Sequence, residues 1–101
     1  MSFSSQISGD GHQLVINIQG RFDFSTHQDF RNCYETLPTE PTAYRLDMGE
    51  ATYLDSSALG MLLLLRDRAG GDKKSIEIVN CNPDIKKILM ISNFQQLFTI
   101  Q

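Results

Sequence analysis

The sequence predicts an α/β domain with a mixed β-sheet of four to five strands, an antiparallel N-terminal hairpin and three to four covering α-helices. Short runs with strand-like alternation are separated by stretches whose apolar residues recur at helical spacing, in the order β-β-α-β-α-β-α-β. Strands that alternate with helices are typical of parallel pairing through right-handed crossovers. The chain has 101 residues, which is the length of one compact domain, and we expect residues 1–101 to form a single domain.

The first two strands are predicted to form the hairpin. Residues 3–7 suggest a weak strand, and Asp10-Gly11 is a turn signal because glycine tolerates the positive φ that tight turns need. Residues 12–19 alternate between apolar and polar side chains, which predicts a half-buried strand. Residues 20–24 are expected to break that strand.

A helix and a buried strand are predicted next. The helix is expected to begin at Ser25, because Gln28 three residues later completes a capping-box pattern. An apolar stripe at helical spacing follows, and Pro38 is expected to end the helix. Residues 43–48 alternate as a strand, and residues 49–54 are expected to form a loop.

Two further helices complete the pattern. One is predicted from Ser56 to about Ala69, with a left-handed residue in Gly70-Gly71 at its end. Residues 75–79 predict a strand. Asn82-Pro83 places a capping residue before a proline at the first helical position, which predicts the start of the last helix. Residues 98–100 suggest a short final strand.

Composition and charge exclude several classes of function. The net charge is −3 and no Lys/Arg cluster exceeds a pair, so the chain lacks the basic stripe of a nucleic-acid-binding protein. The longest apolar run, residues 61–65, is far too short to span a membrane, and the N-terminus lacks the pattern of a signal peptide. Cys33 and Cys81 belong to no metal-binding or redox motif. We therefore expect a cytoplasmic protein with free cysteines, no cofactor, and no nucleic-acid or membrane partner.

The segment Asp55-Ser56-Ser57 stands where a strand and loop lead into an apolar helix. A hydroxyl there can cap the helix, attack a substrate or accept a phosphoryl group. Asp55 alone can supply the cap, which leaves both serines available. The following five apolar residues, 61–65, turn through about 500° of helix, so one buried face cannot hold them all. Either a neighbouring element covers the second side of the helix, or an apolar patch lies exposed next to the serines, which would suggest a protein-binding surface.

Enzyme activity is not expected. The segment lacks the Gly-x-Ser-x-Gly elbow of hydrolases, and His12 and His27 are expected to be solvated surface residues rather than a catalytic base. Gly9-Asp10-Gly11 is a turn rather than a phosphate-binding loop. Phosphoryl acceptance, in contrast, has a physical basis. A phosphate at the first helical turn meets unpaired N–H groups and adds about −1.5 to −2 charge next to Asp55.

Residues 55–60, Asp-Ser-Ser-Ala-Leu-Gly, closely resemble the Asp-Ser-Ser/Thr-Gly/Ala-Leu-Gly signature of STAS-domain anti-sigma factor antagonists. Gly20-Arg21-Phe22-Asp23 resembles their Gly-x-Leu/Phe-Asp motif, and Asn82-Pro83 resembles their Ser/Asn-Pro helix start. The resemblance covers nearly the whole chain, although Ala58 stands where glycine is frequent.

The resemblance implies a mixed sheet with helices largely on one side and a partner-switching role in bacterial signal transduction and transcription regulation. The unphosphorylated form would bind an anti-sigma factor or related serine kinase and release its target. The kinase would phosphorylate Ser56, with Ser57 the lesser candidate, and a serine phosphatase would reverse this. The residues expected to contact the partner are Arg21, Asp23, Asp55, Ser57, Leu59 and Met61.

An alternative stays open at this point. A constitutive STAS-domain scaffold or adaptor would have the same fold and use the serines only as caps. Its output could be a process other than sigma-factor control, such as biofilm formation or motility.

Overall fold

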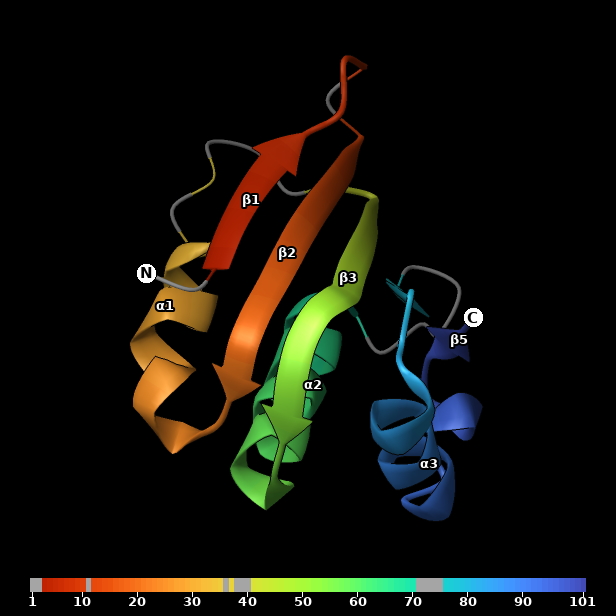
Figure 1. The fold of residues 1–101 in the computed structure, drawn as a ribbon. Helices are drawn as coiled ribbons and strands as arrows, with labels where there is room; N and C mark the ends of the chain where they lie inside the picture. The colour runs from red at the N-terminus through yellow and green to blue at the C-terminus, as the bar shows by residue number, and fades with distance from the viewer. Residues whose placement is uncertain (1–2, 11, 36, 38–40, 71–75) are drawn as a thin grey trace.

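The computed structural model describes residues 3–10, 12–35, 37, 41–70 and 76–101 (Figure 1). Five strands form one sheet: β1 (Phe3–Ile7), β2 (Gln13–Phe22), β3 (Ala43–Leu54), β4 (Ile76–Val79) and β5 (Thr99–Ile100). The helices are α1 (His27–Asn32), α2 (Ser56–Arg68) and α3 (Pro83–Ile91). Short 3-10 turns occupy Phe24–Thr26 and Phe94–Gln96.

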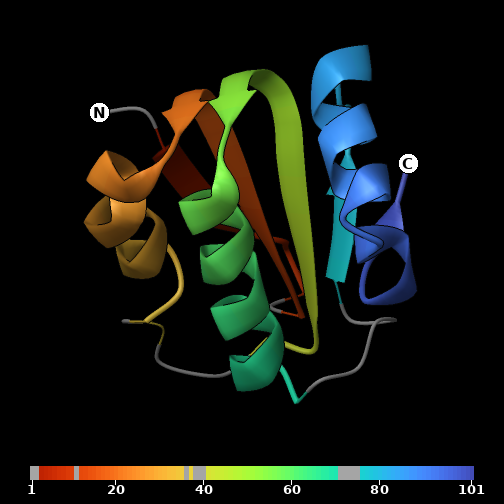
Figure 2. The ribbon, with the colours of Figure 1, turned by 90° about the horizontal axis from the view of Figure 1, so that it is seen from below.

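The strands lie in the sheet in the order in which they occur in the chain. β1 pairs with β2 antiparallel, and β2, β3, β4 and β5 pair parallel. Every parallel crossover therefore steps the same way, and right-handed crossovers then put their helices on the same face. Figure 1 shows α2 behind the sheet, and Figure 2 shows the three helices side by side. The predicted mixed sheet, with its antiparallel N-terminal hairpin and three covering helices, is confirmed.

The core lies between the sheet and the helices. Alternate residues of β2 and β3 are buried on the helix side and meet one face of α2. The buried side chains of these three elements include Leu14, Ile16, Ile18, Phe22, Tyr44, Leu46, Met48, Leu54, Ala58, Met61, Leu62 and Leu65. This packing fixes where α2 starts relative to the end of β3.

β2 and β3 are longer than predicted, and this is a correction. β2 does not break at Gly20, which keeps the strand going with a φ of 72°. Residues 49–54 are not a loop, because β3 continues to Leu54. The pairing of β3 with β2 shifts twice, once between Asn17 and Gln19 and once between Gly20 and Arg21. Each shift adds one residue to β3. The alternation of buried and exposed residues that is typical of a strand is therefore lost there.

The first helix also differs from its prediction. Asp23, rather than Ser25, is the capping residue, and it caps a 3-10 turn whose capping box is completed by Thr26. The 3-10 turn at Phe24–Thr26 precedes α1, which ends at Asn32. The predicted end at Pro38 lies outside the described residues, as do Gly11, Gly71 and Ser75. The predicted starts of α2 and α3 are confirmed, with Asp55 and Asn82 as their capping residues.

The described residues also bear on membrane-spanning helices and on the state of the two cysteines. None of its helices combines the length and the hydropathy needed to cross a membrane. Cys33 and Cys81 are both free, and burial raises the pKa of each thiol.

Candidate functional site

Two segments far apart in the sequence meet at the carboxyl ends of β2 and β3. Phe22 and Leu54 are paired residues at the ends of these parallel strands. The next residue of each segment is an aspartate, Asp23 and Asp55. Neighbouring strands lie about 4.8 Å apart, so the two acidic segments emerge side by side. Functional loops of parallel sheets are commonly found at this edge.

Asp55 organises the start of α2. Its backbone is extended, and its Oδ1 accepts a hydrogen bond from the Ala58 N–H at 3.1 Å. The same oxygen accepts a hydrogen bond from the Ser57 hydroxyl at 2.6 Å. Asp55 is thus the helix cap, and it also holds the half-buried Ser57 side chain.

Ser56 has a different environment. It is the first residue of α2 and is exposed to solvent. Among the described residues, its hydroxyl takes part in no hydrogen bond. The first N–H groups of a helix have no partner within the helix, and the helix dipole favours negative charge beside them. Of the two adjacent serines, Ser56 therefore has the available hydroxyl.

Asp23 is held in the neighbouring turn. Its carboxylate accepts hydrogen bonds from the Ser25 N–H, the Ser25 hydroxyl and the Arg21 Nε, and its own N–H donates to the Thr26 hydroxyl. The Ser25 hydroxyl, followed by Arg21, holds the pKa of the Asp23 carboxyl below its ordinary value. Asp23 is therefore an anion in a fixed orientation.

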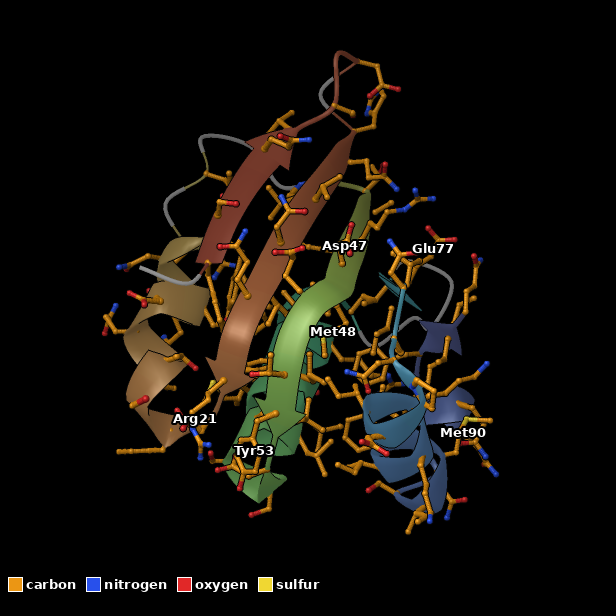
Figure 3. All side chains as sticks on the ribbon, viewed as in Figure 1. Arg21, Asp47, Met48, Tyr53, Glu77 and Met90 are labelled. Carbon is orange, nitrogen blue, oxygen red and sulfur yellow. The ribbon has the colours of Figure 1, made fainter. Side chains whose placement is uncertain are left out.

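Arg21 and Tyr53 form a contact that the sequence patterns do not reveal. They are paired residues of β2 and β3, and the Arg21 guanidinium lies 4.0 Å from the centre of the Tyr53 ring. Figure 3 shows them adjacent near the ends of the two strands. Tyr53 was missed because residues 49–54 lack strand alternation. The nearest basic group in the sequence is ten residues from Ser56, whereas the sheet places Arg21 one strand away.

Phe24 is a second residue that sequence patterns miss. Its side chain is 76% exposed, and its ring stacks on His27 with the centroids 6.1 Å apart. Phe24 directly follows Asp23, so an exposed aromatic ring stands next to the fixed carboxylate. Such a ring is a common anchor in protein–protein interfaces.

One of the residues expected to contact the partner is buried. Met61 is 4% exposed and belongs to the core, because it lies on the face of α2 that packs against the sheet. Leu59 is half-buried and packs against the core. The apolar residues that α2 exposes are instead Leu63 and Leu64.

His12 and Ser56 lie at opposite ends of the sheet. His12 stands just before β2, and the ten residues of β2 extend about 33 Å toward the Ser56 edge. His27 stacks on Phe24. Two surface cavities, of about 210 and 360 Å³, are lined by other residues than these histidines and Ser56.

Comparison with known proteins adds a family and a set of similar folds. The family model described as "Mlab, STAS domain" matches residues 5–99. A STAS-domain containing protein of Pseudomonas aeruginosa (strain UCBPP-PA14) is 58% identical over 100 residues, which cover 99% of each chain.

Solved structures of lower identity share the fold. An anti-sigma factor antagonist from Mycobacterium paratuberculosis is 16% identical with a TM-score of 0.79, covering 98% of this chain and 85% of that one. The Bacillus cell fate determinant SpoIIAA in its phosphorylated form is 16% identical with a TM-score of 0.72, covering 99% and 91%.

Proposed function

Since this chain belongs to the STAS-domain family, we propose that it acts as an anti-sigma factor antagonist whose binding is switched by phosphorylation of Ser56. The unphosphorylated form binds an anti-sigma factor or a related serine kinase and thereby frees the target of that protein. A serine phosphatase restores the binding form. The proposal gives the chain itself no catalytic role.

The observation that carries this proposal is the difference between the two serines. The Ser57 hydroxyl is bound to Asp55, whereas the exposed Ser56 hydroxyl has no hydrogen-bond partner among the described residues. A kinase can reach Ser56 without breaking a bond that caps α2. The fold neighbours named as anti-sigma factor antagonists support the same class of function.

The physical basis of the switch is added charge. A phosphoserine carries about −1.5 to −2 charge at neutral pH. On Ser56 this charge stands next to Asp55 and near Asp23, which is already an anion. The N–H groups at the start of α2 favour a phosphate, so the modified chain stays folded. A partner surface shaped for a neutral hydroxyl would repel this charge or have to bury it away from water.

The test uses Ser56→Ala and Ser56→Asp as paired baits in extracts of the native cell. We expect Ser56→Ala to retain a protein that Ser56→Asp does not, because only the second variant carries a negative charge at the helix start. That protein is called the Ser56-selective partner below. Ser92→Asp, at an exposed site after α3, is the control for a negative charge placed elsewhere on the surface.

Phosphorylation itself is tested with a purified kinase that the baits identify, ATP and intact-mass measurement. We expect one phosphate on the wild-type chain and on Ser57→Ala, and none on Ser56→Ala. Phosphate on Ser56→Ala would refute the assignment. A constitutive adaptor, the alternative, predicts that chain purified from its native cell carries no phosphate under any growth condition.

A further inference from the structure

β1 lies at one margin of the sheet, and among the described residues it pairs only with β2 (Figure 1). The Ser8 N–H, just after β1, donates to the Gln13 carbonyl at 2.8 Å. Residues of an antiparallel strand alternate between hydrogen-bonded and non-hydrogen-bonded pairs, so every second residue before Ser8 also bonds to β2. The other residues of β1 direct their N–H and C=O groups away from the sheet, and they are Phe3, Ser5 and Ile7.

This edge lacks the features by which proteins usually protect an edge strand. Such features are charged side chains, proline, a β-bulge or a very short strand. β1 has five residues, Phe-Ser-Ser-Gln-Ile, without charge or proline, and its pairing with β2 contains no shift. β5, at the other margin of the sheet, is only two residues long. β1 is therefore the edge to which a further strand can add through main-chain hydrogen bonds.

One of the two surface cavities, of about 210 Å³, lies beside this edge. Residues of β1, of α1 and at the end of α1 line it, namely Phe3, Ser4, Ser5, Asp29, Asn32 and Cys33. Phe3 lies on the helix side of the sheet, because its ring meets the rings of Phe22 and Phe30 edge-on. Side chains alternate between the two faces of a strand, so Ser5 and Ile7 share that side. A strand added to β1 would therefore direct every second side chain toward α1 and the cavity.

Ile7 is the apolar residue that this edge leaves exposed. Its side chain is 43% exposed, although it lies on the helix side of β1 and opposite a buried residue of β2. Two copies of β1 paired antiparallel about Ser5 place each Phe3 opposite Ile7 of the other copy, and this register pairs all five residues of the strand. Each Ile7 then lies on the helix side of the sheet, next to the cavity of the other copy. On the opposite face, the same register places Ser4 opposite Gln6.

We propose that this protein forms a two-fold dimer in which β1 pairs antiparallel with β1 of a second copy and joins the two five-stranded sheets into one. Phe3, Ser5 and Ile7 supply the main-chain hydrogen bonds, and Ile7 of each copy occupies the cavity of the other. The occupant follows from self-complementarity, because apolar residues face apolar residues, a hydroxyl faces a hydroxyl, and β1 carries no charge. The interface is small, so the dimer is reversible.

The register is tested with two single variants, Ser4→Cys and Gln6→Cys. In the proposed dimer these positions form a non-hydrogen-bonded pair, whose Cα atoms lie about 4.5 Å apart, within the range of a disulfide. We expect an equimolar mixture to give a disulfide-linked dimer of the two variants under mild oxidation, with the linkage identified by mass spectrometry of the digested protein. Each variant alone should stay largely unlinked, because its introduced thiol faces a native side chain. The wild type, with its free Cys33 and Cys81, is the control.

Sedimentation equilibrium of further variants tests the hydrogen bonds and the cavity. Ser5→Pro removes an N–H from the open edge and none from the pairing with β2, so the dissociation constant of the dimer should rise at least about tenfold. Ser5→Ala, the matched control, keeps that N–H and should stay within about twofold of the wild type. Ile7→Glu should also raise the constant at least about tenfold, because its carboxylate would enter a cavity that Asp29 lines.

A wild-type dimer that Ser5→Pro and Ile7→Glu weaken, and that Ser5→Ala does not, supports the inference. A wild type that is monomeric at about 1 mM overturns it. So does a folded Ser5→Pro that dimerises like the wild type, or a mixture of the cysteine variants that gives no more linked product than either alone. If Ser5→Pro does not fold, Ile7→Glu and the cysteine pair decide, because these side chains are exposed.

The inference goes beyond the proposed function and does not depend on it. Every measurement uses this chain alone, so failure to capture the Ser56-selective partner would count only against the proposed function.

Discussion

The Asp23 carboxylate is held by three donors from two residues, the Ser25 N–H, the Ser25 hydroxyl and the Arg21 Nε. Hydrogen bonds to the charged form of a carboxyl favour that form, and here the Ser25 hydroxyl has the largest effect on the pKa. A partner that approaches this edge therefore meets a carboxylate that is ionised and fixed in direction.

Ser25→Ala should raise the pKa of Asp23 toward its ordinary value of 3.8, measured by NMR titration of the carboxyl carbon. Because the folded-state pKa of Asp23 is lowered, the stability that its carboxylate contributes is complete above the ordinary pKa of 3.8. That stability is lost as the pH falls through the folded-state pKa. Ser92→Ala, at an exposed site after α3, is the control. An Asp23 pKa unaffected by Ser25→Ala would contradict this explanation.

Substitution of Asp55 is predicted to lower the free energy of unfolding, whereas substitution of Ser56 is not. Asp55→Ala removes the helix cap and the partner of Ser57, so the free energy of unfolding should fall by about 1 kcal/mol in urea denaturation. Asp55→Asn keeps an accepting oxygen and should cost less. Ser56→Ala should change the free energy by less than about 0.5 kcal/mol, because no hydrogen bond among the described residues is lost. An equal loss in Ser56→Ala would mean that Ser56 has a structural role.

At the scale of elements, the ends of β2 and β3 decide the shape of the site. Gly20 adopts a φ of 72° within β2, next to a shift in the pairing with β3. The buried residues of β3 are two positions apart from Tyr44 to Met48 and three positions apart from Met48 through Ala51 to Leu54, and the two shifts account for this change. As a result the pairing resumes with Arg21 beside Tyr53 and with Leu54 beside Phe22.

Gly20→Ala should therefore lower the free energy of unfolding by about 1–2 kcal/mol, because an alanine is strained at this positive φ although its Cβ has open space. Gly20→Asn is the matched control and should cost less, since asparagine tolerates the left-handed region. Urea denaturation measures both. A neutral or stabilising Gly20→Ala would show that β2 can relax at this point.

At the scale of the whole molecule, the helices occupy one face of the sheet and leave polar side chains on the other. Arg45 of β3 binds Glu77 of β4 through two contacts of 3.1 Å, and the Asn80 amide donates to Asp47 at 3.2 Å. Figure 3 shows Asp47 and Glu77 on these neighbouring strands. Among the residues that the structure describes, no helix lies on this polar face, so its ion pair is screened by solvent.

A double-mutant cycle of Arg45→Ala and Glu77→Ala should give a coupling energy below about 1 kcal/mol that shrinks in high salt. The measurement is urea unfolding of the two single variants and the double variant at low and high ionic strength. A larger coupling that salt does not change would show that this face is covered by something else in solution.

Local patterns sufficed for much of the fold. The alternation of residues 12–19 predicted the first part of β2. The capping residues Asp55 and Asn82 predicted the starts of α2 and α3, and Gly70 predicted the end of α2. These signals depend on residues within a strand or a helical turn. The extension of β3 to Leu54 could not be predicted, because the two extra residues of β3 can be recognised only from its pairing with β2.

For the candidate site, local sequence patterns were enough to predict the pair of serines at a helix start and the acidic residue that caps the helix. Strand pairing and core packing placed Asp23 beside Asp55, set Arg21 over Tyr53 and buried Met61. Core packing also decided that the face of α2 with Ser56, Gly60, Leu63 and Leu64 is exposed. The physical reason is that capping acts between neighbours in the chain. Which side chains share a surface depends instead on strand pairing and on the face of each helix that the core covers.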